Sequence, residues 1–290
     1  MKYAFVGLSG GAGATTLAFA FAEYLAGLRI AEGDPAGGGT DARRRRGGAS
    51  GRRRRDALAA AVVEINDVNR PPCGFDYDRV GMDKHFAGRE YVSFYRLLSQ
   101  GRPVRGLSNF DGGVNWILRV PGESFDRFEI VEFIRLIDNA AGDAVICDVN
   151  GAFGLSLDRE GARIGELRKI LDDMDRVCAV VDPLPSGMMA DREKLELFKD
   201  YESSGGDIVY LLNKCNPGVN RREARAFLKV RGALEIPYFS PADVYAAEYN
   251  CCTVYALPEI ARSLAGPFEK LRDRLPLSNR IEALQRSRQP

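Results

Sequence analysis

Short apolar runs alternate with longer stretches of helical spacing along most of the chain. The apolar runs predict strands at residues 3–6, 28–32, 114–120, 144–148, 176–181, 208–212 and 233–236. Apolar positions three and four apart predict helices at residues 15–25, 125–141, 160–171, 188–201, 221–230, 242–249 and 258–275. This alternation predicts an α/β fold, a doubly wound and mostly parallel sheet with helices on both faces.

A glycine-rich turn separates the first predicted strand from the first predicted helix. It contains Gly10, Gly11 and Gly13, after which Thr15 and Thr16 open the helix. Glycines let the backbone approach an anion closely, and the N–H groups at the start of a helix point toward it. The hydroxyl of Thr15 stands where phosphate-binding loops hold Mg²⁺. The turn is therefore a candidate phosphate site, the alternative being a tight strand-to-helix turn without a ligand.

The usual phosphate-loop motif, G-x-x-x-x-G-K-[ST], is incomplete in this chain. When Gly13 and Thr15 are aligned with the motif, Leu8 stands at its first glycine and Ala14 at its lysine. That lysine normally provides the point charge that meets the β- and γ-phosphates. The main-chain cradle can form without it, whereas the main cationic contact is missing.

Asp34, Asp148 and Asn213 each stand at or just after the end of a predicted strand. The carboxyl ends of parallel strands share one edge of the sheet, where such folds bind their ligands. Asp34 is a candidate catalytic residue that orients a water molecule, and with Asp148 and Thr15 it is a candidate magnesium ligand. Asn213 can both donate to and accept from a base. Each of the three could instead stabilise a turn.

The glycine-rich turn resembles the deviant phosphate loop of the ParA/MinD superfamily of ATPases, K-G-G-x-G-K-T-T. It is most similar to the TadZ/CpaE branch, where G-G-V-G-A-T-T-L-A is typical, and residues 10–18 differ from that version only at Ala12. The resemblance implies a P-loop NTPase fold with ATP and Mg²⁺ as cofactors. The residues that it implies for cofactor binding are Ser9, Gly10, Gly11, Ala12, Gly13, Ala14, Thr15 and Thr16.

Further segments are similar to the superfamily in chain order. Residues 32–35, Glu-Gly-Asp-Pro, resemble its D-x-D-P motif, and the strand that ends in Asp148 resembles its h-h-h-h-D strand. By the same resemblance Asn213 would lie near the adenine base, and Pro237 would belong to an I-P-x segment that closes the adenine pocket. The resemblance covers nearly the whole chain except residues 37–105.

The resemblance also implies an activity and a kind of partner. Ser9 replaces the signature lysine that reaches the partner's nucleotide across a dimer, and Ala14 replaces the second lysine. We therefore expect at most a slow ATPase. The protein would form a homodimer and act as a positioning or scaffold factor, with protein partners in a pilus or secretion assembly. The alternatives are a pseudo-ATPase that acts only through protein contacts and a ParA-type DNA-partitioning ATPase.

Eight arginines stand in two blocks within residues 43–55. They are Arg43, Arg44, Arg45, Arg46, Arg52, Arg53, Arg54 and Arg55. Mutual repulsion and few apolar neighbours predict a solvated loop. The alternative is contact with an anionic surface, whether nucleic acid, acidic lipid headgroups or the acidic face of a partner. We predict a single domain over residues 1–275, with an irregular Arg-rich insertion at about 37–105 and a tail at 276–290.

The chain has 290 residues and a formal net charge of +1, so no overall field favours nucleic acid. Its single histidine, His85, and its six cysteines without a C-x-x-C pair argue against zinc and against histidine acid–base chemistry. No apolar run approaches the ~20 residues of a membrane span, and the first residues lack the pattern of a signal peptide. We expect a cytoplasmic protein, with peripheral attachment at the inner face of the cell membrane as the other option.

Overall fold

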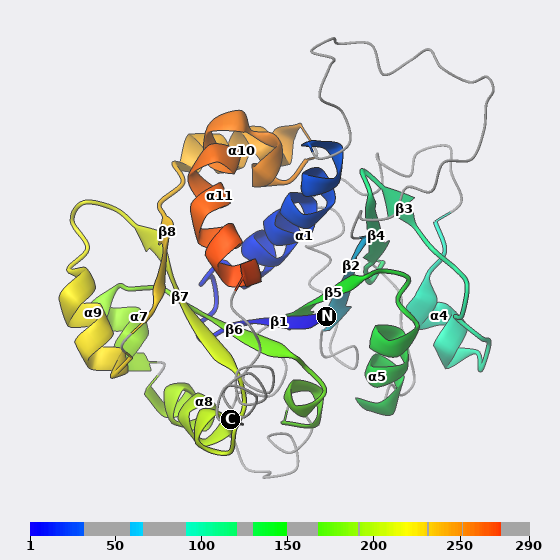
Figure 1. Cartoon of the computed structure of the whole chain (residues 1–290), viewed down its shortest axis with the longest axis horizontal. Coiled ribbons are helices and arrows are strands. Elements are labelled where there is room, and N and C mark those ends of the chain that lie inside the picture. Colours follow the sequence, from blue (N-terminus) through cyan, green and yellow to red (C-terminus); the bar gives the residue numbers. More distant parts are fainter. Residues whose placement is uncertain are drawn as a thin grey trace, which may run out of the picture.

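One mixed sheet runs through the computed structural model, which describes residues 1–31, 59–65, 91–120, 130–149, 168–190, 192–230, 232–250 and 252–273. The order of its strands is β3-β4-β2-β5-β1-β6-β7-β8. The strands are β1 Lys2–Gly7, β2 Ala60–Ile65, β3 Phe110–Asp111, β4 Val114–Ile117, β5 Ala144–Val149, β6 Arg176–Val181, β7 Ile208–Cys215 and β8 Leu234–Pro237. Every neighbouring pair is parallel except the β3–β4 hairpin (Figure 1). The predicted mostly parallel sheet is confirmed.

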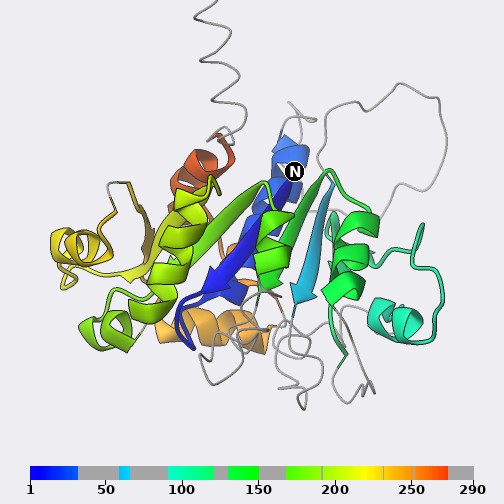
Figure 2. The same ribbon diagram turned by 90° about the horizontal axis from the view of Figure 1, so that it is seen from below.

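Helices cover both faces of the sheet (Figure 2). One face is covered by α1 Ala14–Ala31, α10 Pro241–Tyr249, the short 3₁₀ helix η1 Val254–Ala256 and α11 Pro258–Asp273. The other face is covered by α4 Phe94–Ser99, α5 Ile130–Asn139, α7 Pro185–Ala190, α8 Arg192–Ser203 and α9 Arg221–Leu228. The predicted doubly wound architecture is therefore confirmed.

The central strand β1 is apolar along its length because both of its faces are buried. Ala4 belongs to the core on the α5 and α8 face, and Tyr3 to the core on the α1 and α11 face. On the latter face Phe21 of α1 contacts the rings of Tyr3 and Phe268, with ring centroids 5.1 and 5.2 Å apart. These contacts hold α1 between the sheet and α11, which sets the direction of the helix that follows the glycine-rich turn.

The second strand along the chain is not where the sequence pattern predicts it. Helix α1 continues to Ala31, so the strand predicted at 28–32 is wrong. The strand that pairs with β4 and β5 is β2, which lies inside the segment expected to be irregular. A short apolar run cannot be distinguished from a helical turn by periodicity alone. In β2 the β-branched Val62, Val63 and Ile65 favour a strand although two alanines precede them.

The other predicted strands are confirmed, with their ends moved by a few residues. The helix predicted at 188–201 corresponds to α7 and α8, and the helix predicted at 125–141 is described from Ile130 onward, as α5. The arginine blocks, His85 and the predicted tail lie outside the described residues. No helix in the described ranges combines the length and the apolarity that crossing a bilayer needs.

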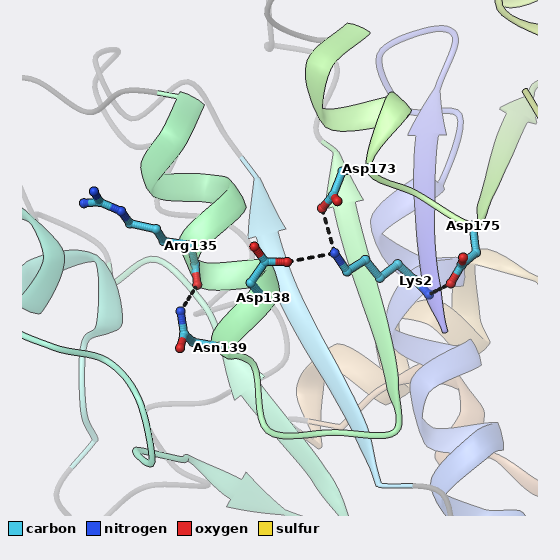
Figure 3. Close-up of polar contacts among 6 residues, drawn as sticks. All are labelled: Lys2, Arg135, Asp138, Asn139, Asp173 and Asp175. Atoms are coloured by element: carbon cyan, nitrogen blue, oxygen red, sulfur yellow. Dashed lines mark hydrogen bonds and ion pairs between the residues drawn. The ribbon is translucent and has the colours of Figure 1, made fainter.

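Lys2 fixes the amino end of β1 (Figure 3). Its Nζ donates to Asp138 on α5 and to Asp173, which precedes β6, at 2.8 Å each. Its main-chain N–H donates to the carboxylate of Asp175 at 2.7 Å. Burial disfavours the charged ammonium, but the hydrogen bonds to Asp138 and Asp173 outweigh that effect and raise the pKa of Lys2. The central strand is thus held at this edge of the sheet, and the glycine-rich turn follows at the opposite edge.

A fully buried arginine joins β6 to α11. The guanidinium of Arg176 donates from Nε to Asp207 at 2.8 Å and from Nη1 to the main-chain oxygen of Leu271 at 2.6 Å. Leu271 lies in the last turn of α11, where carbonyl groups lack helical partners. Arg176 therefore satisfies both a carboxylate and the end of a helix.

Replacing Arg176 with alanine should lower the free energy of unfolding by about 3–5 kcal/mol, because Asp207 would keep a poorly solvated charge without its partner. Lys199→Ala is the control, since it removes a pair with Glu196, whose side chain is 61% exposed, and should change stability by less than about 1 kcal/mol. Chemical denaturation measures both variants. Equal losses would contradict the anchoring role of Arg176.

Candidate functional site

The glycine-rich turn extends from the carboxyl end of β1 to the first turn of α1. The main-chain N–H of Leu8 donates to Val180 at 3.0 Å, which continues the β1–β6 ladder up to the turn. Gly11 and Gly13 then have φ values of 78° and 90°, in the left-handed region that favours glycine. The N–H of Ala12 donates back to Ser9 at 3.2 Å and closes the turn. The first strand and the first helix are thus joined by the loop shape that the sequence predicts.

The first part of the candidate cradle is exposed, and the side chain of Leu8 does not fill it. Gly10 and Gly11 are exposed, whereas Leu8, at the position of the missing first glycine, is fully buried in the core on the α5 and α8 face. Thr15 and Thr16 lie half-buried in the first turn of α1. The main-chain N–H groups at the start of this helix therefore follow an exposed glycine turn, an arrangement that suits an anion.

Asn213, near the end of β7, is hydrogen-bonded to the glycine-rich turn. Its Nδ2 donates to the main-chain oxygen of Ala12 at 2.7 Å, and its Oδ1 accepts from the N–H of Lys214 at 2.9 Å. A Cβ at Gly13 would lie 2.4 Å from this Nδ2, which is too close for any side chain. The structure thus brings the amide of Asn213 against the glycine-rich turn. Each of its polar side-chain atoms can make one further hydrogen bond.

Lys214 also reaches the turn, a contact that the sequence analysis missed. Its Nζ donates to the main-chain oxygen of Gly11 at 2.8 Å and to Oδ2 of Asp182 at 2.7 Å. Asp182 directly follows β6, and its other oxygen accepts the N–H of Leu184 at 3.2 Å. The sequence shows a lysine beside Asn213, but nothing in its periodicity indicates that two successive side chains turn toward one loop.

Two carboxylates lie side by side on the strands next to β1. Asp148 of β5 is directly paired with Glu64 of β2 on one side and with Phe5 of β1 on the other. Asp148 has no exposed surface, and Glu64 is 3% exposed and accepts the main-chain N–H of Arg119 at 2.8 Å. By strand alternation both carboxylates belong to the face on which α1 packs. Glu64 is the second residue that sequence reasoning missed, because its strand was not predicted.

Three predicted site residues remain: Asp34, Pro237 and Thr15. Asp34 lies outside the described residues, and the strand that was expected to place it at this edge is absent from residues 28–31, which are helical. Pro237 ends β8, at the side of the sheet beyond β7, and Tyr238 after it donates its N–H to the oxygen of Cys215 at 3.2 Å. Thr15 and Asp148 share the α1 face, since α1 packs against β5.

The groups available at this edge are main-chain amides, hydroxyls, carboxylates, the side-chain amide of Asn213 and the ammonium of Lys214. In the parts of the chain that the structure describes, no group of three or more His, Cys, Asp or Glu could hold a metal ion by itself. Cys147 and Cys178 are fully buried, and burial raises the pKa of both thiols far above the ordinary value, which disfavours the reactive thiolate form. A hydroxyl and carboxylates suit Mg²⁺ when phosphate oxygens and water complete its shell.

Solved structures of ParA and MinD ATPases share this fold. A ParA family ATPase from Chlorobium tepidum has a TM-score of 0.60 and 15% identity, over 92% of this chain and 98% of that chain. A chain of the MinC:MinD cell division complex from Aquifex aeolicus has a TM-score of 0.60 and 14% identity, over 94% and 96%. MinD from Pyrococcus horikoshii, complexed with Mg-ADP, has a TM-score of 0.57 and 11% identity, over 94% and 97%. No family model and no curated protein matches the sequence, so these likenesses establish the fold.

The shape of the turn predicts unequal effects of two similar substitutions. Gly13→Ala should lower the free energy of unfolding by about 1–3 kcal/mol, because an alanine there is strained at φ 90° and displaces Asn213. Gly10→Ala is the matched control in the same turn, since its Cβ would meet no atom within 4 Å, and should stay within about 0.5 kcal/mol. Thermal and chemical denaturation compare the two. A neutral Gly13→Ala would mean that the turn has another shape in solution.

Proposed function

We propose that this chain is a ParA/MinD-like, nucleotide-binding positioning or scaffold protein of the TadZ/CpaE type, which binds ATP with Mg²⁺ and hydrolyses it slowly or not at all. The observation that carries the proposal is the main-chain shape of the glycine-rich turn. Two left-handed glycines and an open helix N-terminus remain at the carboxyl edge of the central strand although the loop lysines are absent.

In this proposal the phosphates bind the main-chain N–H groups of residues 10–15, apart from that of Ala12, which closes the turn. Helix α1 is 18 residues long, so its first turn presents unpaired N–H groups and the positive end of a full helix dipole. Thr15 would provide the magnesium hydroxyl ligand, and the Asp148 carboxylate would act through water. Glu64 is directly paired with Asp148 on the neighbouring strand, and we infer that it shares this role.

The base would lie toward β7 and β8. Asn213 already contacts the turn and keeps one further hydrogen bond on each polar atom of its amide, which suits an adenine edge. Pro237 ends the neighbouring strand and would close the pocket. MinD from Pyrococcus horikoshii was solved with Mg-ADP on the same fold, which supports this choice of ligand.

Slow or absent hydrolysis follows from the residues at positions 9 and 14. Phosphoryl transfer depends on cations that stabilise the charge spread over the transferred group. Ser9 and Ala14 carry no charge. The nearby carboxylates are negatively charged, like the phosphates, so they cannot stabilise the charge of the transferred group. The protein would therefore act through the binding of ATP to the site more than through the hydrolysis of ATP.

The partners are inferred from the resemblance of residues 9–18 to the TadZ/CpaE branch. We propose a homodimer with protein partners in a pilus or secretion assembly, in the cytoplasm or peripherally at the inner face of the membrane. A chain of the MinC:MinD complex has the same fold, which is consistent with a role that depends on a protein partner. Contact of residues 43–55 with nucleic acid or another acidic surface is the less favoured option, because the net charge is close to zero.

Titration with Mg-ATP by calorimetry tests the nucleotide site. The wild-type protein should bind weakly, and Ala14→Lys should bind about tenfold or more tightly, since a charged hydrogen bond contributes about 1.5–3 kcal/mol. Ser9→Lys is a second variant in case lysine at the buried position 14 disturbs folding. Ala226→Lys, at an exposed position of α9, controls for added charge and should leave the affinity unchanged.

The absence of Mg-ATP binding by every variant would contradict the nucleotide-binding proposal.

The alternative function is a pseudo-ATPase that acts only through protein contacts, and it is favoured by the uncharged Ser9 and Ala14. It predicts a dimer whose formation does not depend on nucleotide. Retention on DNA that falls steeply with salt would instead support a ParA-type partitioning ATPase.

A further inference from the structure

Lys214 is a cation at the glycine-rich turn that comes from another strand. Within the described residues, the hydrogen bonds place its ammonium between the main-chain oxygen of Gly11, at 2.8 Å, and the carboxylate of Asp182, at 2.7 Å. Its side chain is 38% exposed, and that of Asp182 is 12% exposed. A lysine ammonium has three donors on a flexible stem, so two bonds leave one donor for a further acceptor.

The end of β7 is built to turn two successive side chains toward the turn. In a regular strand Asn213 and Lys214 would point to opposite faces of the sheet. Here Lys214 has a left-handed backbone with φ 58°, and the pairing of β7 with β8 shifts register between Leu212 and Cys215. This irregularity lets Asn213 reach the oxygen of Ala12 while Lys214 reaches that of Gly11. A lysine seldom adopts such a backbone, and the bond from its N–H to Asn213 supports it.

We propose that Lys214 is a phosphate-binding residue that supplies the positive charge which Ser9 and Ala14 do not, and that it exchanges Asp182 for the phosphate oxygens of a nucleoside di- or triphosphate. The inference rests on the proposed nucleotide site. In the free protein Asp182 compensates the ammonium and keeps it beside the turn. When phosphates occupy the main-chain amides, the ammonium leaves the carboxylate for the higher charge of the phosphates, with no covalent step.

A second role for the same contacts would be a fixed brace that only shapes the turn, and the two roles predict opposite effects of Asp182→Asn. If Lys214 exchanges partners, removing the carboxylate removes a competitor of the phosphates and strengthens binding. If Lys214 is only a brace, the same change loosens the brace and weakens binding. Whether Asp182→Asn raises or lowers the affinity for Mg-ATP therefore distinguishes the exchange role from the brace role.

The experiment is calorimetric titration of the full chain with Mg-ATP and, separately, with adenosine. Lys214→Met should weaken Mg-ATP binding about tenfold, as expected for loss of one charge-assisted contact. Asp182→Asn should strengthen it about threefold or more, and Lys214→Arg should keep most of it. Binding of adenosine, which has no phosphate, should not respond to any of these changes.

Two further variants distinguish the loss of the cation at position 214 from misfolding of the strand end. Lys214→Asn removes the cation but tolerates a left-handed backbone, so a loss of binding shared with Lys214→Met is not caused by misfolding of the strand end. Lys229→Met is the matched control, because Lys229 also has a left-handed backbone, with φ 55°, and lies at the end of α9.

Weaker Mg-ATP binding by Asp182→Asn, or unchanged binding by Lys214→Met, would overturn the exchange while leaving the nucleotide site intact. If the wild-type chain, Ala14→Lys and Ser9→Lys all fail to bind Mg-ATP, the proposed function itself fails, and the role of Lys214 fails with it.

Discussion

The amide of Asn213 leaves room for a glycine, and for no larger residue, at position 13. Any Cβ there would lie 2.4 Å from Nδ2, and Asn213 cannot move away without losing its bonds to Ala12 and to the N–H of Lys214. The loop after β1 is thereby shaped by the end of β7, which is two strands away in the sheet. The proposed anion site depends on this contact, because the shape of the loop sets the direction of its main-chain N–H groups.

The rest of the architecture serves to bring these strand ends together. Lys2 fixes β1 at the amino edge, and Arg176 joins β6 to α11, so the register between β1, β6 and β7 is set far from the site. Residues that are distant along the chain, at 11, 148, 182 and 214, then come to one edge of the sheet. Because the two loop lysines are missing, the site retains main-chain and carboxylate groups and takes its cation from β7. This composition supports the proposal of a site that binds a nucleotide and hydrolyses it slowly or not at all.

Much of this could be read from the sequence, and the parts that could not have physical reasons. The strand, glycine turn and helix at residues 2–31 have a local signature, and Asp148 and Asn213 are found from strand ends alone. The strand predicted at 28–32 was wrong because its apolar residues also fit a helix, and with it the argument that placed Asp34 at the site was lost. Glu64 was missed because its own strand, β2, begins with two alanines and was not predicted. The contact of Lys214 with the glycine-rich turn depends on a left-handed backbone and a register shift. Neither feature changes the periodicity of apolar residues from which strands are predicted.

The central claim is that the main chain of the glycine-rich turn binds phosphate without the loop lysines. A crystal structure of the protein with Mg²⁺ and a non-hydrolysable ATP analogue tests it most directly. The account predicts phosphate oxygens at hydrogen-bond distance from the main-chain N–H groups of Gly13, Ala14 and Thr15. An analogue bound elsewhere, or a turn that stays empty when the analogue is in large excess, would contradict it.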